Sequence, residues 1–154
     1  MIRLAELHRD NWEVCAALRV TPEQSDFIAS NLHSIAEAQF LIGFSSLAIY
    51  QEDIAVGYAL FGLDPDDGMY WIYRLMIDER YQNLGYGSTA IRQVVEVVKE
   101  RPDRTSLIRL GYHPDNEAAR RLYAKVGFTE EGLAPWGEMI AAYPLTEKKE
   151  GIQP

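Results

Sequence analysis

Several short hydrophobic runs bounded by polar residues in the first half of the chain indicate β-strands. Ile2–Leu7 alternates from the start, and Ser46–Tyr50 and Ile54–Leu63 are separated by three polar residues, a spacing that suits a hairpin. Asp64–Gly68 has turn composition, and the next run, Tyr70–Ile77, is apolar on both faces. We therefore predict an antiparallel meander of three strands, whose last member lies at the centre of a sheet.

Helical periodicity predicts the layers that cover this sheet. The longest helix ends near Lys99 and carries its apolar residues at i, i+3, i+4 and i+7. Those residues are Ile91, Val94, Val95 and Val98. Another helix starts at Pro114–Asn116, and Gly127 ends it. Its stripe consists of Ala119, Leu122, Tyr123 and Val126.

Two shorter helices are expected before the hairpin. One runs from Asp10 or Asn11 to Leu18, and the other spans Asn31–Phe40. Thr21–Gln24 has the composition of a further helix start, because proline is favoured in the first turn. The inward residues predicted for the two helices are Val14, Ala17 and Leu18, and Leu32, Ile35, Ala36 and Phe40.

The order of elements fixes the fold class. Ser106–Tyr112 is predicted as a strand after the long helix, and Phe128–Glu131 and Glu138–Leu145 as two closing strands. The fold is therefore α/β (α+β), with a mixed central β-sheet of about seven strands flanked by about four helices. Residues 1–146 form a single domain, and 147–154 are a polar tail.

Composition excludes several classes of protein. The formal net charge is −8, which disfavours binding to nucleic acid and is compatible with a cationic small substrate. No apolar run is long enough to cross a bilayer, so no membrane partner is expected. A single cysteine, Cys15, suits a reducing, cytoplasmic location and is interpreted as a packing residue.

The stretch with the clearest chemistry is Gln82–Ser88, a glycine-spaced turn between the central strand and the long helix. Gly85 and Gly87 let the backbone approach an anion closely, and the start of the helix adds unpaired N–H donors. Ser88 adds a hydroxyl. The alternative is that the two glycines only make a tight turn.

This turn, with the pattern Gln82-x-x-Gly85-x-Gly87, resembles the acetyl-CoA pyrophosphate loop of the GNAT N-acetyltransferase superfamily. A second block, Asn116–Phe128, resembles that superfamily's other recurring segment, and the two blocks have the expected order and separation. The resemblance implies a GNAT-like fold, acetyl-CoA as the acetyl donor, and direct transfer to an amine. No metal is expected, and a homodimer is an assembly compatible with the resemblance.

The resemblance also assigns roles to individual residues. Tyr123 matches the tyrosine that often protonates the CoA sulfur, the alternative being an aromatic residue that only packs. Ser88 stands where many relatives carry a basic residue, so Arg80, Arg92 and Lys125 are the candidates for the nucleotide phosphate. The predicted cofactor-binding residues are Met76, Ile77, Gln82, Asn83, Gly85, Tyr86, Gly87, Ser88, Asn116 and Lys125.

Looser similarity along the chain points to the spermidine/spermine branch, through segments such as Asp64–Gly68 and Tyr70–Arg74. A polyamine is a flexible polycation, so its site should offer carboxylates and aromatic faces. The predicted substrate-binding residues are Glu37, Trp71, Tyr73 and Glu138.

Three matters stay open at this point. The general base is one of Glu138, Glu37 and His113. His8 and His33 have no other catalytic or metal-binding residue type at a suitable spacing. The acceptor, if not a polyamine, is an aminoglycoside, an amino acid or a protein N-terminus. A non-catalytic acyl-CoA-binding module is the remaining alternative.

Overall fold

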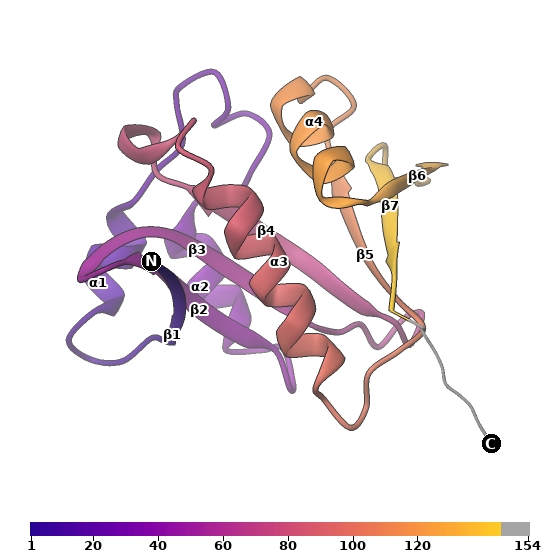
Figure 1. The fold of residues 1–154 in the computed structure, drawn as a ribbon, viewed down its shortest axis with the longest axis horizontal. Coiled ribbons are helices and arrows are strands. Elements are labelled where there is room, and N and C mark those ends of the chain that lie inside the picture. The colour runs from indigo at the N-terminus through magenta and orange to yellow at the C-terminus, as the bar shows by residue number, and fades with distance from the viewer. Residues whose placement is uncertain (146–154) are drawn as a thin grey trace.

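The computed structural model describes residues 1–145, which form one seven-stranded sheet with helices on both of its faces (Figure 1). The strands are β1 (Ile2–Glu6), β2 (Ser45–Gln51), β3 (Ile54–Leu63), β4 (Tyr70–Ile77), β5 (Leu107–Tyr112), β6 (Thr129–Leu133) and β7 (Met139–Pro144). The helices are α1 (Trp12–Ala17), α2 (Asn31–Ala38), α3 (Tyr86–Lys99) and α4 (Glu117–Val126), with a 3-10 turn, η1 (Glu79–Tyr81). The predicted polar tail, 147–154, lies outside the described residues.

The sheet confirms the predicted fold class and topology. Its strand order is β1-β2-β3-β4-β5-β7-β6, so the strand predicted to be central lies in the middle. The pairs β2–β3 and β3–β4 are antiparallel and form the predicted meander. The single parallel pair within the described sheet is β4–β5, because α3 carries the chain across the sheet between them.

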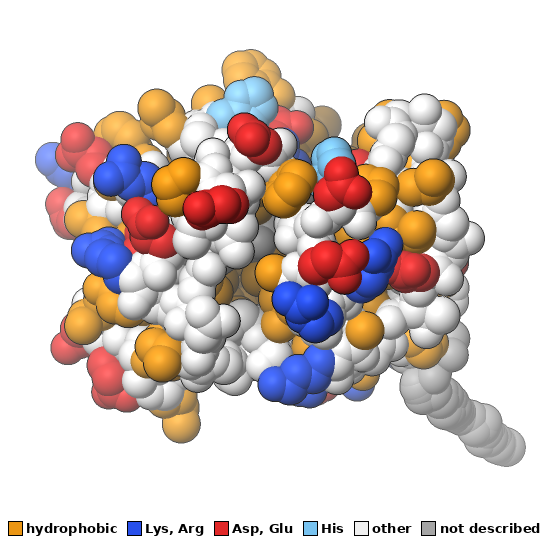
Figure 2. All heavy atoms as spheres, turned by 90° about the horizontal axis from the view of Figure 1, so that it is seen from above, with side chains coloured by type: hydrophobic (Ala, Val, Ile, Leu, Met, Phe, Trp, Pro, Cys, Tyr) orange, Lys and Arg blue, Asp and Glu red, His pale blue; other side chains and the backbone are white. Residues whose placement is uncertain are grey.

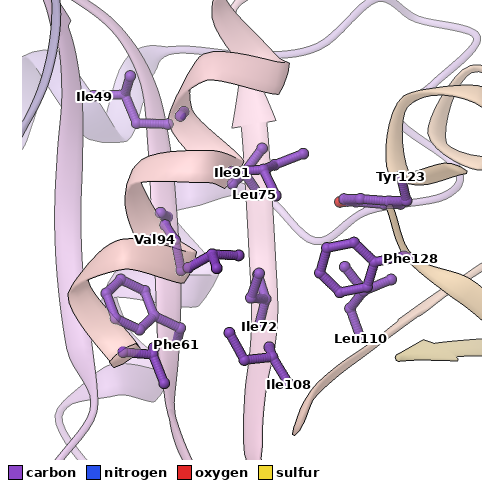
Figure 3. Close-up of a cluster of buried hydrophobic side chains, with 14 of the residues drawn as sticks. Ile49, Phe61, Ile72, Leu75, Ile91, Val94, Ile108, Leu110, Tyr123 and Phe128 are labelled. Carbon is purple, nitrogen blue, oxygen red and sulfur yellow. The ribbon is translucent and has the colours of Figure 1, made fainter. Parts of the chain in front are cut away.

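Apolar residues are buried on both faces of the sheet. On one face Ile91 and Val94 of α3 pack against Phe61 and Ile72 of the central strands (Figure 3). On the other face α1 and α2 cover a smaller cluster that contains Tyr58. Burial on two faces explains why β3 and β4 lack the alternation of a half-exposed strand. Within residues 1–145 no helix has the length and apolar character needed to span a bilayer.

The predicted inward faces of α1 and α2 are largely wrong. Val14 is 58% exposed and Phe40 is 86% exposed, while Ala17, Leu32 and Ala36 also face solvent. Of the residues predicted to face inward from α2, Ile35 does pack against the smaller cluster, but the fully buried residues of this helix are polar. Asn31 donates to the Cys15 carbonyl at 2.9 Å, and the Ser34 hydroxyl donates to the Ser30 carbonyl at 3.0 Å. Hydrogen-bonded polar residues can be buried at low cost, so apolar periodicity alone selects the wrong face. Cys15 is buried, and Leu18 is inward as predicted.

The helix predicted to start at Thr21–Gln24 does not form. Thr21 and Gln24 do make the reciprocal side-chain contacts of a helix start, each backbone N–H bonding the other's side chain at 3.3 Å. The chain then continues as separate turns up to residue 28. The Gln24 side chain also accepts a bond from Gln82 Nε2 at 2.8 Å, which ties this segment to the glycine-spaced turn.

Candidate active site

The site begins where the two central strands separate. β4 and β5 pair only at Tyr70–Ile72, opposite Ile108–Leu110, and beyond that point they diverge. The rest of β4, from Arg74 to Ile77, therefore has strand partners on the β3 side alone. A cleft of about 780 Å³ occupies the gap. Figure 2 shows its mouth as a hollow between the two halves of the molecule.

The backbone between β4 and α3 gives this cleft an anion-binding end. Asn83 and Gly85 have φ angles of 65° and 85°, and Gly85 is the N-cap residue of α3. The first N–H groups of α3 have no intrahelical acceptor and carry the positive end of the helix dipole. Gln82 braces the turn by donating to the Ile77 carbonyl at 2.9 Å. The Ser88 hydroxyl donates back to the Gly85 carbonyl at 3.1 Å, so it stabilises the turn from within.

The opposite wall of the cleft is α4. Asn116 caps this helix by accepting from the Ala119 N–H at 3.1 Å, and it also lines the cleft. Of the three basic residues predicted for the nucleotide phosphate, only Lys125 lines the cleft. Arg80 is ion-paired with Asp78 at 2.8 Å. All ten residues predicted to bind the cofactor line this one cleft: Met76, Ile77, Gln82, Asn83, Gly85, Tyr86, Gly87, Ser88, Asn116 and Lys125.

Tyr123 projects from α4 into the same cleft. Its side chain is 8% exposed and packs between Tyr112 and Phe128, with ring centroids 5.8 and 5.7 Å away. In Figure 3 its oxygen points away from α4, toward the strand that carries Leu75. Burial raises the pKa of the Tyr123 hydroxyl, with a smaller contribution from Tyr112, so the group stays protonated at physiological pH. A protonated phenol facing the cleft can act as an acid.

A second cavity, of about 450 Å³, adjoins the first and is acidic. We call it the acidic pocket. Five carboxylates and three large aromatic side chains line it, with one guanidinium. They are Glu37, Asp64, Asp66, Asp67, Glu138, Trp71, Tyr73, Trp136 and Arg74. All four residues predicted to bind the substrate, which are Glu37, Trp71, Tyr73 and Glu138, are among them.

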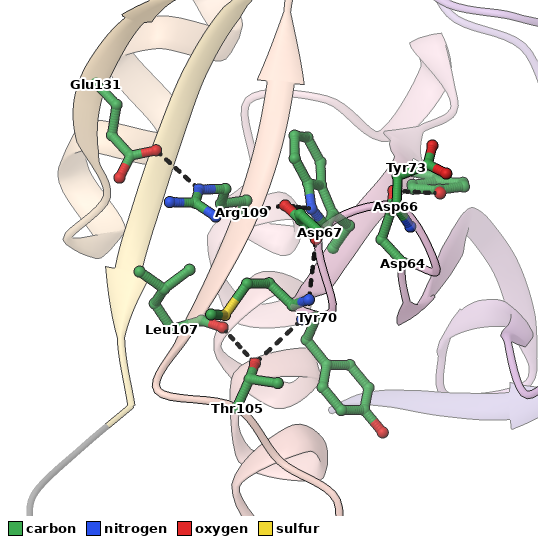
Figure 4. Close-up of polar contacts among 11 residues, drawn as sticks. Asp64, Asp66, Asp67, Tyr70, Tyr73, Thr105, Leu107, Arg109 and Glu131 are labelled. Carbon is green, nitrogen blue, oxygen red and sulfur yellow. Dashed lines mark hydrogen bonds and ion pairs between the residues drawn. The ribbon is translucent and has the colours of Figure 1, made fainter.

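Hydrogen bonds hold the acidic pocket in shape (Figure 4). The Tyr73 hydroxyl donates to Asp64 at 2.6 Å, and Trp71 Nε1 donates to Asp67 at 2.8 Å. Arg109 also contacts Asp67, at 3.3 Å. Burial is the larger cause and the hydrogen bond to Asp64 the smaller cause that raise the pKa of the Tyr73 hydroxyl, which therefore stays protonated and remains a donor. Asp66 makes no side-chain hydrogen bond or ion pair within residues 1–145, which leaves its carboxylate available to a ligand.

The two cavities meet at a short stretch of wall. The residues that line both are Ile72, Tyr73, Arg74, Gly111 and Glu138. The register of β3 and β4 shifts here, leaving Tyr73 as an extra residue between Ile72 and Arg74. Arg74 Nη2 forms an ion pair with Glu37 at 3.0 Å. A molecule in the cleft and another in the acidic pocket would therefore meet beside these residues.

Several residues of the two cavities escaped prediction. Gln24, Gly111 and Arg121 line the cleft, and Trp136 reaches the acidic pocket from the β6–β7 turn. The acidic residues Asp64, Asp66 and Asp67 are close together in the sequence, and this is the one local signal of the acidic pocket. Gln24, Gly111, Arg121 and Trp136 have no such signal, because only the folding of the chain brings them to the cavities. Of the histidines, His113 lines neither cavity: its Nδ1 accepts from the Asp115 N–H at 3.1 Å, and its ring packs against Phe27.

Comparison with known proteins agrees with this geometry. The model of the acetyltransferase (GNAT) family matches residues 2–128. The spermine/spermidine N(1)-acetyltransferase of Bacillus subtilis (strain 168) is 28% identical over 137 residues, which cover 85% of this chain and 90% of that protein.

Solved structures share the fold at lower identity. Aminoglycoside acetyltransferase AAC(6')-Ib in complex with coenzyme A has a TM-score of 0.76 and 17% identity, covering 94% of this chain and 95% of that one. The ribosomal-protein-S18-alanine N-acetyltransferase from Escherichia coli has a TM-score of 0.71 and 16% identity, covering 99% of both chains. The family model spans most of the sequence, and so the chain belongs to the acetyltransferase (GNAT) family and is an N-acetyltransferase.

Proposed function

We propose that this enzyme transfers the acetyl group of acetyl-CoA directly to an amino group of a small polyamine such as spermidine or spermine. The observation that carries the proposal is the acidic pocket, which joins the cleft beside Glu138. Five carboxylates against one guanidinium favour a ligand with several positive charges, and the rings of Trp71 and Trp136 can face its ammonium groups.

The cleft supports acetyl-CoA as the donor. The N–H groups at Gly85–Ser88 would meet the pyrophosphate, with Lys125 as the partner of the nucleotide phosphate. The unpaired edge of β4 at Met76 and Ile77 would bond the pantetheine arm as another strand does. The similar structure of aminoglycoside acetyltransferase AAC(6')-Ib was solved with coenzyme A, which supports the same cofactor here.

The chemistry assigned to this site needs no covalent enzyme intermediate. A neutral amine attacks the thioester carbonyl carbon, and the C–S bond breaks. The departing sulfur takes a proton from the Tyr123 hydroxyl, and the nitrogen returns one to Tyr123 as the amide forms. Tyr123 suits this role because it is buried beside the cleft with its proton in place. The cationic remainder of the acceptor would stay in the acidic pocket.

The test is a CoA-release assay with matched acceptors. Spermidine and spermine should be acetylated with a kcat/KM at least several-fold above that of an alkyl monoamine of similar length. An aminoglycoside and a peptide with an N-terminal alanine represent the acceptors named for the two solved relatives. Equal efficiency with spermidine and the monoamine would contradict the polyamine assignment, and a preference for either of the other acceptors would replace it.

A further inference from the structure

Glu138 occupies a position that no other carboxylate of the described chain shares. Five residues line both cavities, and among them only Glu138 carries a carboxylate. In the proposed reaction the thioester lies in the cleft and the acceptor lies in the acidic pocket. The reacting nitrogen must therefore cross from one cavity to the other beside this side chain.

The structure holds the Glu138 carboxylate in place from two sides. Trp136 Nε1 donates to its Oε1 at 2.8 Å. Gly111 of β5 lies directly beneath, and a Cβ atom at that position would approach Oε1 to 2.8 Å. The absence of a side chain at Gly111 thus makes room for the carboxylate. Oε2 makes no hydrogen bond within residues 1–145 and remains available to a ligand.

The other two candidates for the general base are less well placed. Glu37 lines only the acidic pocket, and its carboxylate is engaged with Arg74 at 3.0 Å. His113 lines neither cavity. The titratable and charged groups that line the cavities around Glu138 are Glu37 from α2, Asp64, Asp66 and Asp67 from the β3–β4 turn, Tyr73 and Arg74 from β4, Tyr81 from η1, Tyr86 from α3, Tyr112 from β5, and Arg121, Tyr123 and Lys125 from α4.

We propose that Glu138 is the group that accepts the proton of the attacking amine, and that Gly111 and Trp136 position it. This inference rests on the proposed function. The acceptor arrives as an ammonium ion and gives one proton to Glu138 Oε2, directly or through one water molecule. The nitrogen then forms a bond to the carbonyl carbon, and the C–S bond breaks. Tyr123 protonates the thiolate and regains a proton from the nitrogen, while Glu138 releases its proton to solvent.

The decisive variant is Glu138→Gln, which keeps the shape of the side chain and removes its basicity. With spermidine at pH 7 we expect kcat to fall by about 10²-fold or more, with unchanged acetyl-CoA affinity by calorimetry. The deficit should shrink as pH rises toward 10, because the amine then loses its proton to solvent. It should almost vanish with a diamine analogue whose reacting end is an aminooxy group, since that group is already neutral at pH 7.

Gly111→Ala tests the positioning role. The new methyl group displaces the carboxylate, so this variant should lose activity in the same pH-dependent manner while remaining folded. Combined with Glu138→Gln it should add little further loss, because both changes act on one group. Asp66→Asn is the matched control, because it removes a carboxylate that lines the acidic pocket but not the cleft. It should leave the shape of the pH profile of kcat unchanged.

Three results would overturn the inference. Full activity of Glu138→Gln with spermidine at pH 7 would exclude a proton-accepting role. A loss that is equal at all pH values, and equal for the aminooxy analogue, would identify Glu138 as an anchor. Wild-type enzyme that releases no CoA with any amine would remove the proposed function, and this inference with it.

Discussion

At the scale of single residues, Tyr123 gives the sharpest test of the chemistry. Tyr123→Phe should lower kcat by about 10²-fold, because the departing thiolate loses its acid. Acetyl-CoA affinity should change little, since the acid acts chiefly in the transition state. The Tyr123 hydroxyl has no hydrogen-bond partner within residues 1–145, so the thermal midpoint should also stay close to that of the wild type.

Single-turnover rates and thermal unfolding of the same variant separate the two roles of this side chain. A tyrosine that only packs against Tyr112 and Phe128 would lose one hydroxyl and almost no rate. Full activity in Tyr123→Phe would therefore assign the residue to the core alone.

The buried Tyr58 hydroxyl should make the folded state less stable at alkaline pH. The side chain is fully buried, and burial raises its pKa to about 12, above the value near 10 of an unfolded tyrosine. The folded state therefore binds this proton more tightly, so stability present below about pH 10 should be lost as pH rises toward 12. The expected loss is on the order of 2 kcal/mol for this group.

Denaturant midpoints at pH 8 and pH 11 measure this effect. Tyr58→Phe should flatten the dependence, although its stability at pH 8 falls through loss of the Ser46 contact at 2.6 Å. A pH dependence identical to that of the wild type would show that Tyr58 does not contribute to it. Tyr112, whose pKa is also raised to about 12, supplies part of the remaining slope.

Some residues of the candidate site can be predicted from the sequence, whereas others cannot, for a physical reason. The glycine-spaced turn marks Gln82–Ser88 in the sequence, whereas the role of Tyr123 is what the resemblance to the GNAT superfamily implies, because a helix stripe alone indicates packing. Gly111 and Trp136 carry no such pattern. They matter because β5 and the β6–β7 turn approach the Glu138 carboxylate in space, and that approach depends on the pairing of β5 with β7.

At the scale of elements, the turn before α3 can be tested without disturbing the core. Gly85 has a φ angle of 85°, and a Cβ atom there would meet nothing within 4 Å. Gly85→Ala should cost about 1–2 kcal/mol of stability through backbone strain alone. If the free turn relaxes to escape that strain, acetyl-CoA must restore it on binding, so affinity should fall about tenfold.

Gly43→Ala is the matched control for this prediction. Gly43 has a φ angle of 79°, also has open space around it, and lines neither cavity. It should therefore show the same loss of stability with unchanged acetyl-CoA affinity by calorimetry. Equal acetyl-CoA affinities in Gly85→Ala and Gly43→Ala would contradict the proposal that the turn before α3 binds acetyl-CoA. Gly87 is less suitable, because a Cβ atom there lies 3.4 Å from Leu122 of α4.

Strands were predicted more reliably than helix faces. The strands of the meander are continuous apolar runs bounded by turns, and each was placed within one or two residues of its observed limits. For α2 the same reasoning chose the apolar residues as the inner face, whereas Asn31 and Ser34 are inside. Their polar groups are bonded within the protein, and no periodicity of hydrophobic residues reports such bonds.

At the scale of the whole molecule, the site depends on one departure from regular sheet pairing. β4 and β5 remain together at Tyr70–Ile72 and then separate, so that α3 and α4 stand on either side of a gap. The sequence predicts both strands and the parallel crossover between them. It does not predict where pairing stops, because that point follows from the packing of α4 and the β6–β7 hairpin against β5.

The last prediction concerns the charge of the acidic pocket. A carboxylate and an ammonium group at about 4 Å interact by up to ~4 kcal/mol at an effective dielectric of 20, before desolvation is subtracted. Asp66 is exposed, so a net value of about 1 kcal/mol is the reasonable expectation. Asp66→Asn should therefore raise the KM for spermidine about fivefold and leave the KM for acetyl-CoA unchanged. Asp53→Asn makes the same change in net charge in the β2–β3 turn, outside both cavities, and should do neither.

The dependence of KM on salt concentration is an independent test of the attraction between Asp66 and the distal ammonium group of the acceptor. Raising ionic strength should increase the KM for spermidine in the wild type, because partly exposed charges are screened. The increase should be smaller in Asp66→Asn, which has one fewer charge in the pocket, and absent for a monoamine with a neutral tail. If Asp66→Asn and Asp53→Asn respond alike to salt, net charge alone attracts the acceptor, and the acidic pocket does not bind its distal ammonium group.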